Sequence, residues 1–237
     1  VALTADGQAL VPGYYDGVLA VVDPATMAEP RKIQLALGAS QVFTVPGSKQ
    51  ALVLNTSSDR LHMVDPAQAQ AAGELNDKLG YGLWHAQLTP DGKRMLISGW
   101  VSNTLAVVSS SPAMSYALIP LSGKGSCQLA VAPDGKRAYV AHSESDTLVA
   151  VDLVNLREVA SVTVGRFPFS YVAVSPDGAD VLVTNDKDGT VSVVDAATLT
   201  VRQVIPVGSI PRQILFAGNR VFVTCAFSNH TAVLERE

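Results

Sequence analysis

The sequence has few charged residues and no run of basic ones. Charged residues make up 16% of the 237-residue chain, and 17 Lys and Arg against 21 Asp and Glu give a net charge of −4. Nucleic-acid-binding surfaces need clustered cations, so the composition predicts no nucleic-acid partner. Long apolar runs are also absent: stretches such as Val191–Val194 fall far short of the roughly 20 residues of a spanning helix. The sequence therefore predicts no membrane span.

Cysteine and histidine are scarce. The only cysteines, Cys127 and Cys225, occupy non-equivalent positions, which leaves a disulfide possible but unassigned. The four histidines are scattered, and HExxH, GxSxG and CxxC motifs are missing. The segment Asp186–Gly189 lacks the glutamate of a calcium loop and is typical of a hairpin turn. We therefore assign no metal ligands and no catalytic residues, and name no cofactor.

A helical period is likewise missing, and a repeat of about forty residues takes its place. Turn glycines recur at Gly7, Gly47, Gly92, Gly135, Gly178 and Gly218. Runs such as LAVVD, LHMVD, LVAVD and VSVVD recur in the same register. Six units are present, and equal units of this length are typical of propellers and solenoids.

Each unit has the pattern of a four-stranded meander, because short β-branched runs alternate with turn residues. In the fourth unit we expect strands A to D at Cys127–Ala132, Arg137–Ala141, Thr147–Asp152 and Glu158–Val164. A sheet whose strands are apolar on both faces must bury each face against another sheet. Blades stacked around a central channel achieve this. The sequence predicts an all-β propeller in a single domain, residues 1–237.

The fifth unit carries a recognisable motif. Val183-Thr184-Asn185 is followed by GTVSVVD and then IPVGSIP, and this pattern resembles the YVTN-type propeller repeat of bacterial and archaeal secreted or surface proteins. The resemblance covers essentially the whole chain and is strongest in the fourth and fifth units. It implies a periplasmic or extracellular location and specifies fold better than activity.

The two ends of the chain are irregular. Strand A of the first unit is clipped at residues 1–4, and the sixth unit ends after strand C. We expect six blades, the last of three strands; seven blades remain the alternative.

Aromatic and basic residues concentrate in one set of loops. The B–C and D–A connections share one end of a meander, and none of the aromatics falls in the A–B or C–D turns. The resulting candidate binding residues are Tyr15, Trp84, His85, Trp100, Lys124, Gln128, His142, Arg166, Phe167, Tyr171, Arg212 and Phe227. Such a surface favours binding of a protein partner or of a small anionic or aromatic ligand, although loop aromatics also wedge between blades as packing.

Two other functions are open. By resemblance to propeller lyases, His85 and His142 could serve as bases near a metal, with Glu144 as a carboxylate ligand. Propellers of this repeat type also support redox complexes with quinone or haem partners, although this chain lacks a CxxCH haem attachment. We expect a binding scaffold rather than an enzyme.

Overall fold

The computed structural model describes residues 1–75, 79–109 and 115–236. Their strands form six antiparallel sheets, five with four strands and one with three. Within each sheet the strands follow chain order, so every sheet is a meander. This is the blade pattern of a β-propeller and confirms the predicted fold class.

The first three sheets contain strands β1 to β12. Their bounds are β1 (Ala2–Leu3), β2 (Ala9–Pro12), β3 (Val18–Val22), β4 (Arg31–Gln34), β5 (Ala39–Thr44), β6 (Ala51–Asn55), β7 (Arg60–Asp65), β8 (Gln70–Leu75), β9 (Leu83–Leu88), β10 (Arg94–Gly99), β11 (Thr104–Ser109) and β12 (Tyr116–Pro120).

The other three sheets contain β13 to β23. Their bounds are β13 (Ser126–Val131), β14 (Arg137–His142), β15 (Thr147–Asp152), β16 (Arg157–Thr163), β17 (Val172–Val174), β18 (Asp180–Asn185), β19 (Thr190–Asp195), β20 (Val201–Pro206), β21 (Pro211–Ala217), β22 (Arg220–Cys225) and β23 (His230–Glu235). The strands predicted in the fourth unit match β13 to β16 to within one residue at every end. As expected, the sixth sheet stops after its third strand.

The chain packs as two compact units. Unit 1 comprises Val1–Ile97 and Ala106–Leu118, and unit 2 comprises Ser98–Leu105 and Ile119–Glu237. The single domain expected from the sequence, residues 1–237, stays a prediction.

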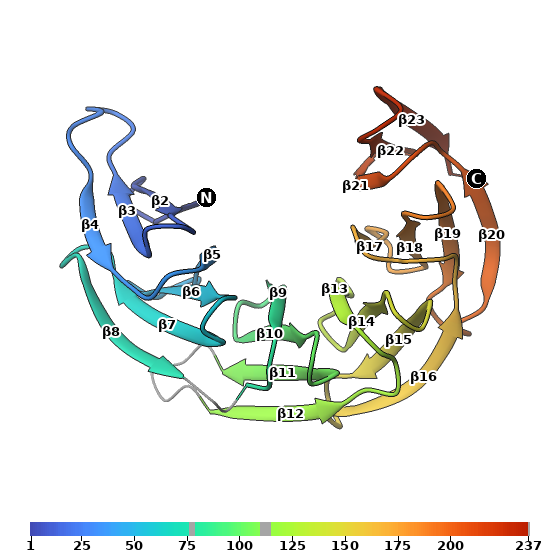
Figure 1. Ribbon diagram of the computed structural model, residues 1–237, viewed down its shortest axis with the longest axis horizontal. Coiled ribbons are helices and arrows are strands. Elements are labelled where there is room, and N and C mark those ends of the chain that lie inside the picture. The colour runs from blue at the N-terminus through green and yellow to red at the C-terminus, as the bar shows by residue number, and fades with distance from the viewer. Residues whose placement is uncertain (76–78, 110–114, 237) are drawn as a thin grey trace. The chain divides into compact units, whose positions relative to one another are not determined.

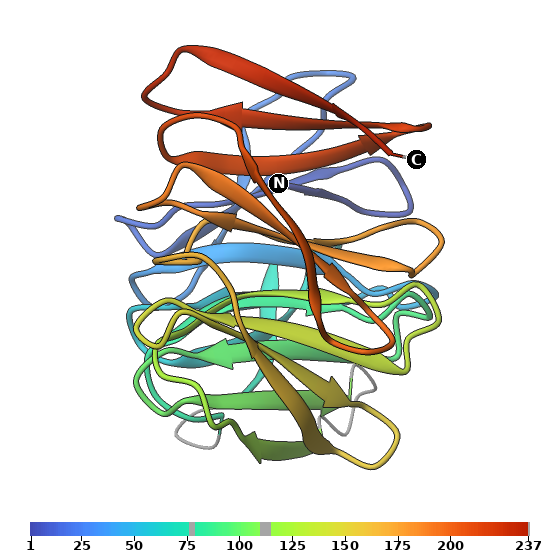
Figure 2. The same cartoon turned by 90° about the vertical axis from the view of Figure 1, so that its right-hand side faces the viewer.

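In unit 2, equivalent strands of successive sheets lie side by side. The A strands β13, β17 and β21 follow one side of the unit, and the D strands β16 and β20 follow the other (Figure 1). Figure 2 shows the last sheet, in red, with its strands joined by hairpins at alternate ends. Side chains between the sheets form apolar layers; one of them joins Tyr139, Leu148, Val183 and Val194. A second layer joins Leu182 and Val191 to Ile214, so both faces of the sheet β17 to β20 are covered, as its strands require.

Unit 1 is built in the same way. One apolar layer lies between the first two sheets and includes Leu10, Leu19 and Val53, and a second includes Leu54, Leu61 and Met95. Within the described residues no helix is long and apolar enough to cross a membrane.

The aspartates that recur from repeat to repeat stabilise turns. At the end of strand C, the carboxylates of Asp65, Asp152 and Asp195 accept the backbone N–H two residues on, at 3.0, 2.8 and 2.9 Å. In the A–B turn, Ser175 Oγ donates to Asp177 Oδ1 at 2.6 Å. Asp side chains stabilise such turns by accepting from their own backbone. The repeated Asp residues therefore have a local structural role, which leaves the loops as the place for specific chemistry.

Candidate functional site

The B–C turns of successive sheets share one backbone feature. Asp59, Asn103, Asp146 and Asn229 all have a positive φ of 51 to 55°. Asn and Asp tolerate this left-handed conformation better than other side-chain-bearing residues. In unit 2 two of these side chains reach the next D–A loop: Asn103 Oδ1 accepts from Gly125 N at 2.8 Å, and Asp146 Oδ1 accepts from Phe167 N at 2.7 Å. The turn thereby fixes the loop beside it.

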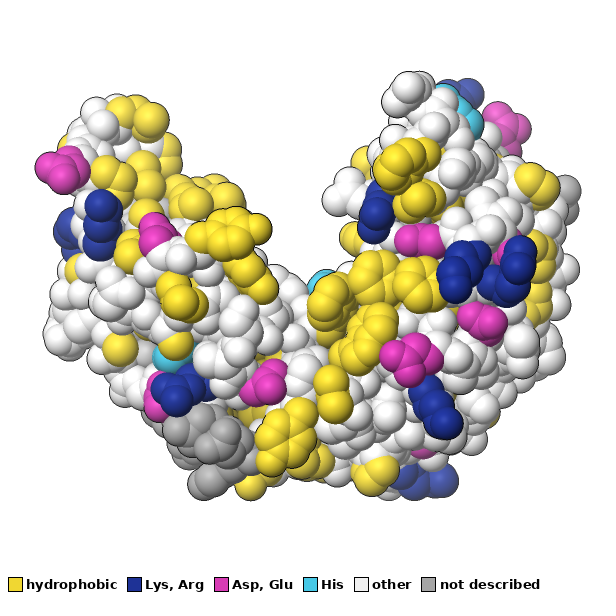
Figure 3. All heavy atoms as spheres, viewed as in Figure 1, with side chains coloured by type: hydrophobic (Ala, Val, Ile, Leu, Met, Phe, Trp, Pro, Cys, Tyr) yellow, Lys and Arg dark blue, Asp and Glu magenta, His cyan; other side chains and the backbone are white. Residues whose placement is uncertain are grey.

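The D–A loop between β16 and β17 carries two aromatic rings that meet a third. Phe167 and Phe169 stack with centroids 5.3 Å apart, and Trp100, from the B–C loop after β10, meets Phe169 edge-on at 5.5 Å. We call Trp100, Phe167 and Phe169 the aromatic cluster. All three are half-buried, and hydrophobic side chains gather over β13, β14 and β17 in this view (Figure 3). Trp100 and Phe169 also pack against the apolar layer between the sheets.

A cation lies on the edge of the aromatic cluster. Lys187 Nζ is 4.8 Å from the centroid of the Phe167 ring, a cation–π distance. Lys187 N also donates to Arg166 O at 3.3 Å, so the B–C loop after β18 is tied to the same D–A loop.

Phe167 is held in a conformation that its side chain disfavours. Its φ is +56°, in the left-handed region where a bulky residue is strained. Besides the bond from Phe167 N to Asp146, Phe167 O accepts from Asp186 N at 3.1 Å. Neighbouring loops therefore hold the ring in place, and Ile210 has the same conformation, with a φ of +50°, in the next D–A loop.

A polar cluster adjoins the aromatic cluster. Ser170 Oγ donates to Asp186 Oδ2 at 2.6 Å and accepts from Arg212 Nη1 at 3.0 Å. Ser170 is 8% exposed, and Asp186 Oδ1 is buried without a hydrogen-bond partner. Burial raises the pKa of the Asp186 carboxyl, against the opposing effects of the Ser170 bonds and the Arg212 charge. We call Ser170, Asp186 and Arg212 the polar cluster.

A β-bulge directs Arg212 into this cluster. In β21 the pairing with β22 shifts between Pro211 and Gln213, which leaves Arg212 as the extra residue. Bulges redirect side chains out of the regular alternation of a strand. A similar irregularity occurs in β13. Ser126 pairs with His142 and Leu129 with Val140, so Cys127 and Gln128 together face the single residue Ala141 of β14.

The other predicted basic residues of unit 2 differ in their pairing. Arg166 Nε donates to Asp188 Oδ1 at 2.6 Å, so its charge is already compensated. Lys124 is exposed, and its backbone N–H donates to Ser145 Oγ at 3.0 Å. The expected basic set is therefore less cationic than the sequence indicates.

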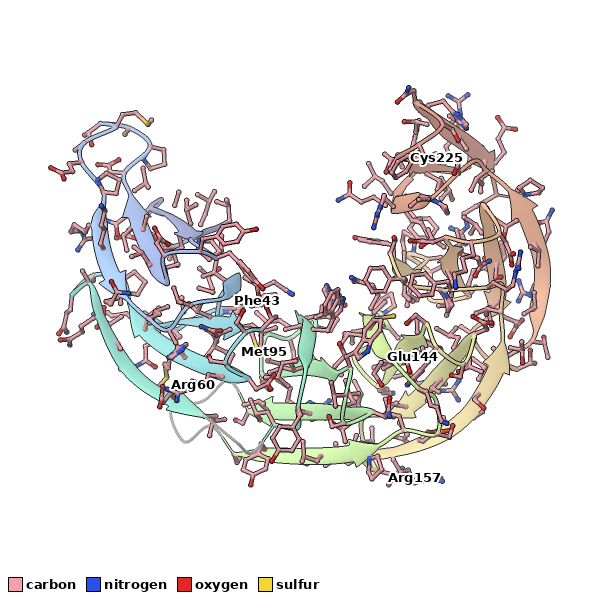
Figure 4. All side chains as sticks on the ribbon, viewed as in Figure 1. Phe43, Arg60, Met95, Glu144, Arg157 and Cys225 are labelled. Carbon is pink, nitrogen blue, oxygen red and sulfur yellow. The ribbon has the colours of Figure 1, made fainter. Side chains whose placement is uncertain are left out.

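His142 lies beneath the loops. It is completely buried, its Nδ1 lies 3.1 Å from Val140 O, and its Nε2 has no partner. Burial lowers its pKa to about 4. The ring occupies the space that a side chain on Gly123 would need, 2.2 Å from His142 Cγ to the added Cβ. His142 thus acts first as a packing residue, whereas Glu144 is exposed in the loop after β14 (Figure 4).

The remaining predicted residues of unit 2 show a range of exposure. Gln128 and Tyr171 are half-buried, and Tyr171 N donates to Thr184 Oγ1 at 2.9 Å. Phe227 is 72% exposed in the loop after β22. The contacts described here join none of the three to the aromatic cluster.

Three predicted residues belong to unit 1. Tyr15 is 91% exposed and packs edge-on against Tyr14 at 5.2 Å. Trp84 is partly exposed, and its carbonyl accepts from Gln41 Nε2 at 3.0 Å. His85 is half-buried, and burial lowers its pKa to about 4. Their place at the same end as the aromatic cluster stays a prediction.

Unit 1 also contains a cavity of about 710 Å³, which lies at A–B and C–D turns and not at the B–C and D–A loops. It is lined by the A–B turns of the first two sheets, including Asp6, Gln8, Pro46 and Lys49, and by Pro66 and Ala67 of a C–D turn. The sequence indicated no site there, and this cavity is the competitor to the aromatic cluster as a ligand site.

Neither cysteine is bridged. Cys127 and Cys225 are free and buried, and burial raises the pKa of Cys127 to about 12. Over the part of the chain that the structure describes, no three His, Cys, Asp or Glu side chains lie close enough together to hold a metal.

Sequence reasoning missed Phe169, Ser170, Asp186 and Lys187 as members of these clusters. Phe169 was visible as a loop aromatic, and Asp186 was considered only as part of a calcium-like run. An alignment of the repeats was the available signal. Cys127 and Ser170 both stand six residues before the Pro of a Pro-Asp-Gly turn, and a polar Ser replaces Cys at this equivalent position.

Comparison with known proteins supports the fold. No family model and no curated protein sequence matches the chain. A solved protein from Lactobacillus plantarum aligns with 99% of this chain and 79% of its own at 17% identity and a TM-score of 0.77. A candidate 6-phosphogluconolactonase from Bacteroides fragilis aligns with 100% of this chain and 79% of its own at 18% identity and a TM-score of 0.75. The Kuenenia stuttgartiensis hydrazine synthase aligns at 14% identity over 98% and 94% of the two chains, with a TM-score of 0.60. At these identities the likeness concerns the fold alone.

Proposed function

We propose that this protein is a propeller scaffold that binds a small molecule on the aromatic cluster of unit 2. The carrying observation is that half-buried rings from two loops meet, since Phe169 contacts both Phe167 and Trp100. Ile210 has the same backbone conformation as Phe167, with a φ of +50°, at the equivalent place of the next D–A loop, so the rings and not the backbone distinguish this loop. Aromatic rings fixed by neighbouring loops are typical of sites that stack on a flat ligand face.

The charges around the cluster favour a neutral ligand over a strongly anionic one. Arg166 is paired with Asp188, and Arg212 faces Ser170 and the Asp186 charge. Lys187 already lies over the Phe167 ring. Lys187 keeps its charge, but a single exposed cation attracts a multiply charged ligand only weakly, so stacking and hydrogen bonding carry the binding.

The experiment uses Trp100 as its reporter. The chain has two tryptophans, so Trp84→Phe leaves Trp100 alone. We expect 4-nitroanisole, a neutral flat quencher, to quench Trp100 fluorescence saturably. Phe167→Leu with Phe169→Leu should weaken this binding by roughly tenfold, because aromatic pairs are worth about 1 kcal/mol each beyond their buried area.

A matched control separates the site from general apolar contact. Val154 is 68% exposed in the C–D turn after β15, and Val154→Ala should leave the quenching unchanged. Linear quenching without saturation, or equal loss in the control, would remove the proposal.

A catalytic role is the second candidate, and Asp186 favours it. A carboxyl whose pKa is raised by burial is suited to acid–base chemistry. His142 is completely buried, which makes it a poorer base than the sequence indicates. The Bacteroides fragilis neighbour supplies the assay: hydrolysis of 6-phosphogluconolactone above the spontaneous rate, abolished by Asp186→Asn, would support this role. No acceleration would leave the binding role alone.

The YVTN-type repeat and an extracytoplasmic location belong to the same proposal. The repeat likeness of Val183–Asn185 and the strands after it supports both. Fractionation of the native host cells tests the location: recovery in the periplasm or medium supports it, and recovery with cytosolic markers contradicts it.

A further inference from the structure

We propose that the polar cluster is a subsite for a neutral ligand rich in hydroxyl groups, a polyol or sugar, whose ring face stacks on the aromatic cluster. This inference rests on the binding role proposed above and names the class of ligand. It is carried by the hydrogen-bonding capacity left over at Asp186 and Arg212.

Asp186 has one carboxylate oxygen without a hydrogen-bond donor. Its Oδ2 is bound by Ser170 Oγ at 2.6 Å, whereas Oδ1 is buried and has no partner. An ionised carboxylate accepts through both oxygens, and a buried acceptor left unsatisfied is costly. A donor brought by a ligand would relieve that cost.

Arg212 presents donors beside this acceptor. Of its five N–H groups, Nη1 supplies one to Ser170 Oγ at 3.0 Å, and the residue is exposed. Ser170 accepts from Arg212 and donates its single proton to Asp186, so its own donor is used. Arg212 therefore shows a ligand several donors, and the half-buried Asp186 can supply its unused acceptor when its carboxylate turns toward the ligand.

This combination selects among ligand chemistries. A fully ionised phosphate or carboxylate can accept from Arg212 but cannot donate to Asp186, and an ammonium group can donate to Asp186 but cannot accept from Arg212. A hydroxyl does both, and two neighbouring hydroxyls do so without strain. Hydroxyl groups are thus the chemistry that satisfies both side chains at once.

The two clusters are joined closely enough to serve one ligand. Ser170 follows Phe169 directly, and Asp186 N donates to Phe167 O at 3.1 Å. The segment 167–170 therefore carries ring surface at one end and a polar group at the other, both held by Asp186. A sugar ring has an apolar C–H face and a polar edge of hydroxyls, which matches this order.

The test compares ligands that differ only in the sugar. In the Trp84→Phe protein, Trp100 quenching is titrated with 4-nitroanisole and with the 4-nitrophenyl β-glycosides of glucose, galactose and mannose. At least one glycoside should bind about tenfold more tightly than 4-nitroanisole, as expected for hydrogen bonds to charged groups. Asp186→Asn and Arg212→Met should each remove this advantage, which is measured in every variant as the ratio of glycoside affinity to 4-nitroanisole affinity.

Controls and outcomes separate this inference from the binding role. Asp134→Asn makes the same chemical change in an A–B turn, where Asp134 Oδ1 accepts only a local backbone bond at 2.9 Å, and should keep the glycoside advantage. If 4-nitroanisole binds but no glycoside gains affinity, or if Asp186→Asn retains the gain, the polyol subsite is wrong and the aromatic site stands. If neither class quenches Trp100, both proposals are wrong. Unchanged thermal unfolding confirms that each variant is folded.

Discussion

Asp146 Oδ1 lies 2.7 Å from the backbone nitrogen of Phe167 and accepts its hydrogen bond, although 21 residues separate the two in sequence. Asn103 and Gly125 repeat the relationship one blade earlier, at 2.8 Å. In these two blades a side chain from the B–C turn thereby sets the path of the following D–A loop. In the fourth blade this bond holds Phe167, the residue on which the proposed ligand site depends.

Removal of the Asp146 carboxylate should loosen this loop. Asp146→Ala loses the acceptor for the Phe167 N–H and places Ala at a φ of +55°. We expect a loss of about 2 kcal/mol in the free energy of unfolding, since bonds to charged groups are worth about that much. Asp146→Asn keeps an acceptor and tolerates the conformation, and should lose less than half as much in urea unfolding. Equal losses for both variants would contradict this role.

Gly123 and His142 are coupled through space. A Cβ on Gly123 would lie 2.2 Å from His142 Cγ, too close for any side chain. Gly123→Ala should therefore destabilise the protein by about 2 kcal/mol, within the usual range for overpacking. His142→Ala makes room, so the double variant should lose less than the sum of the two single variants. Additive losses in thermal or urea unfolding would show that the contact has no energetic weight.

Stability should fall on mild acidification because of the buried histidines. Burial lowers the pKa of His142 and His85 to about 4, below the ordinary value of 6.5. The unfolded chain then binds protons at higher pH than the folded one, so stability is full above pH 6.5 and is lost as the pH falls toward 4. Each histidine should cost about 2 kcal/mol between pH 7 and pH 5.

Urea unfolding at those two pH values measures the effect. His142→Phe, which keeps a buried ring without a proton site, should flatten the pH dependence by about half. A pH dependence identical to that of the unchanged protein would contradict the assignment to His142.

The thiols should be unreactive in the folded protein. Cys127 Sγ lies 3.2 Å from both Ala141 O and Pro168 O, and its pKa is raised by burial to about 12. Burial also raises the pKa of Cys225. Since the thiolate is the reactive form, a thiol reagent at pH 8 should label neither cysteine until the protein is unfolded, and both afterwards. Rapid labelling of the native protein would contradict the packing around β13 and β22.

Much of the architecture follows from the sequence because turn chemistry marks it. Pro133-Asp134-Gly135 and the Asp at the end of strand C locate the hairpins, and short β-branched runs between them locate the strands. The prediction for the fourth sheet was therefore correct to within one residue at each strand end. The three-stranded last sheet was also predicted correctly.

The site was less predictable. Trp100 and Phe167 were expected in a binding surface, because aromatics in these loops break the repeat. Asp186 was missed, because its importance comes from a missing partner at Oδ1, and a pattern of residues does not show which groups stay unsatisfied. His142 was expected near a ligand, but the absence of a Cβ on Gly123 lets its ring sink into the core.

The most direct test of the ligand site is a map of backbone amide shifts by NMR on adding 4-nitroanisole. The account predicts shifts at residues 98–105, 165–171 and 184–188, with little change elsewhere. Shifts at residues 3–8 and 44–50, around the cavity of unit 1, with none at the aromatic cluster, would contradict it.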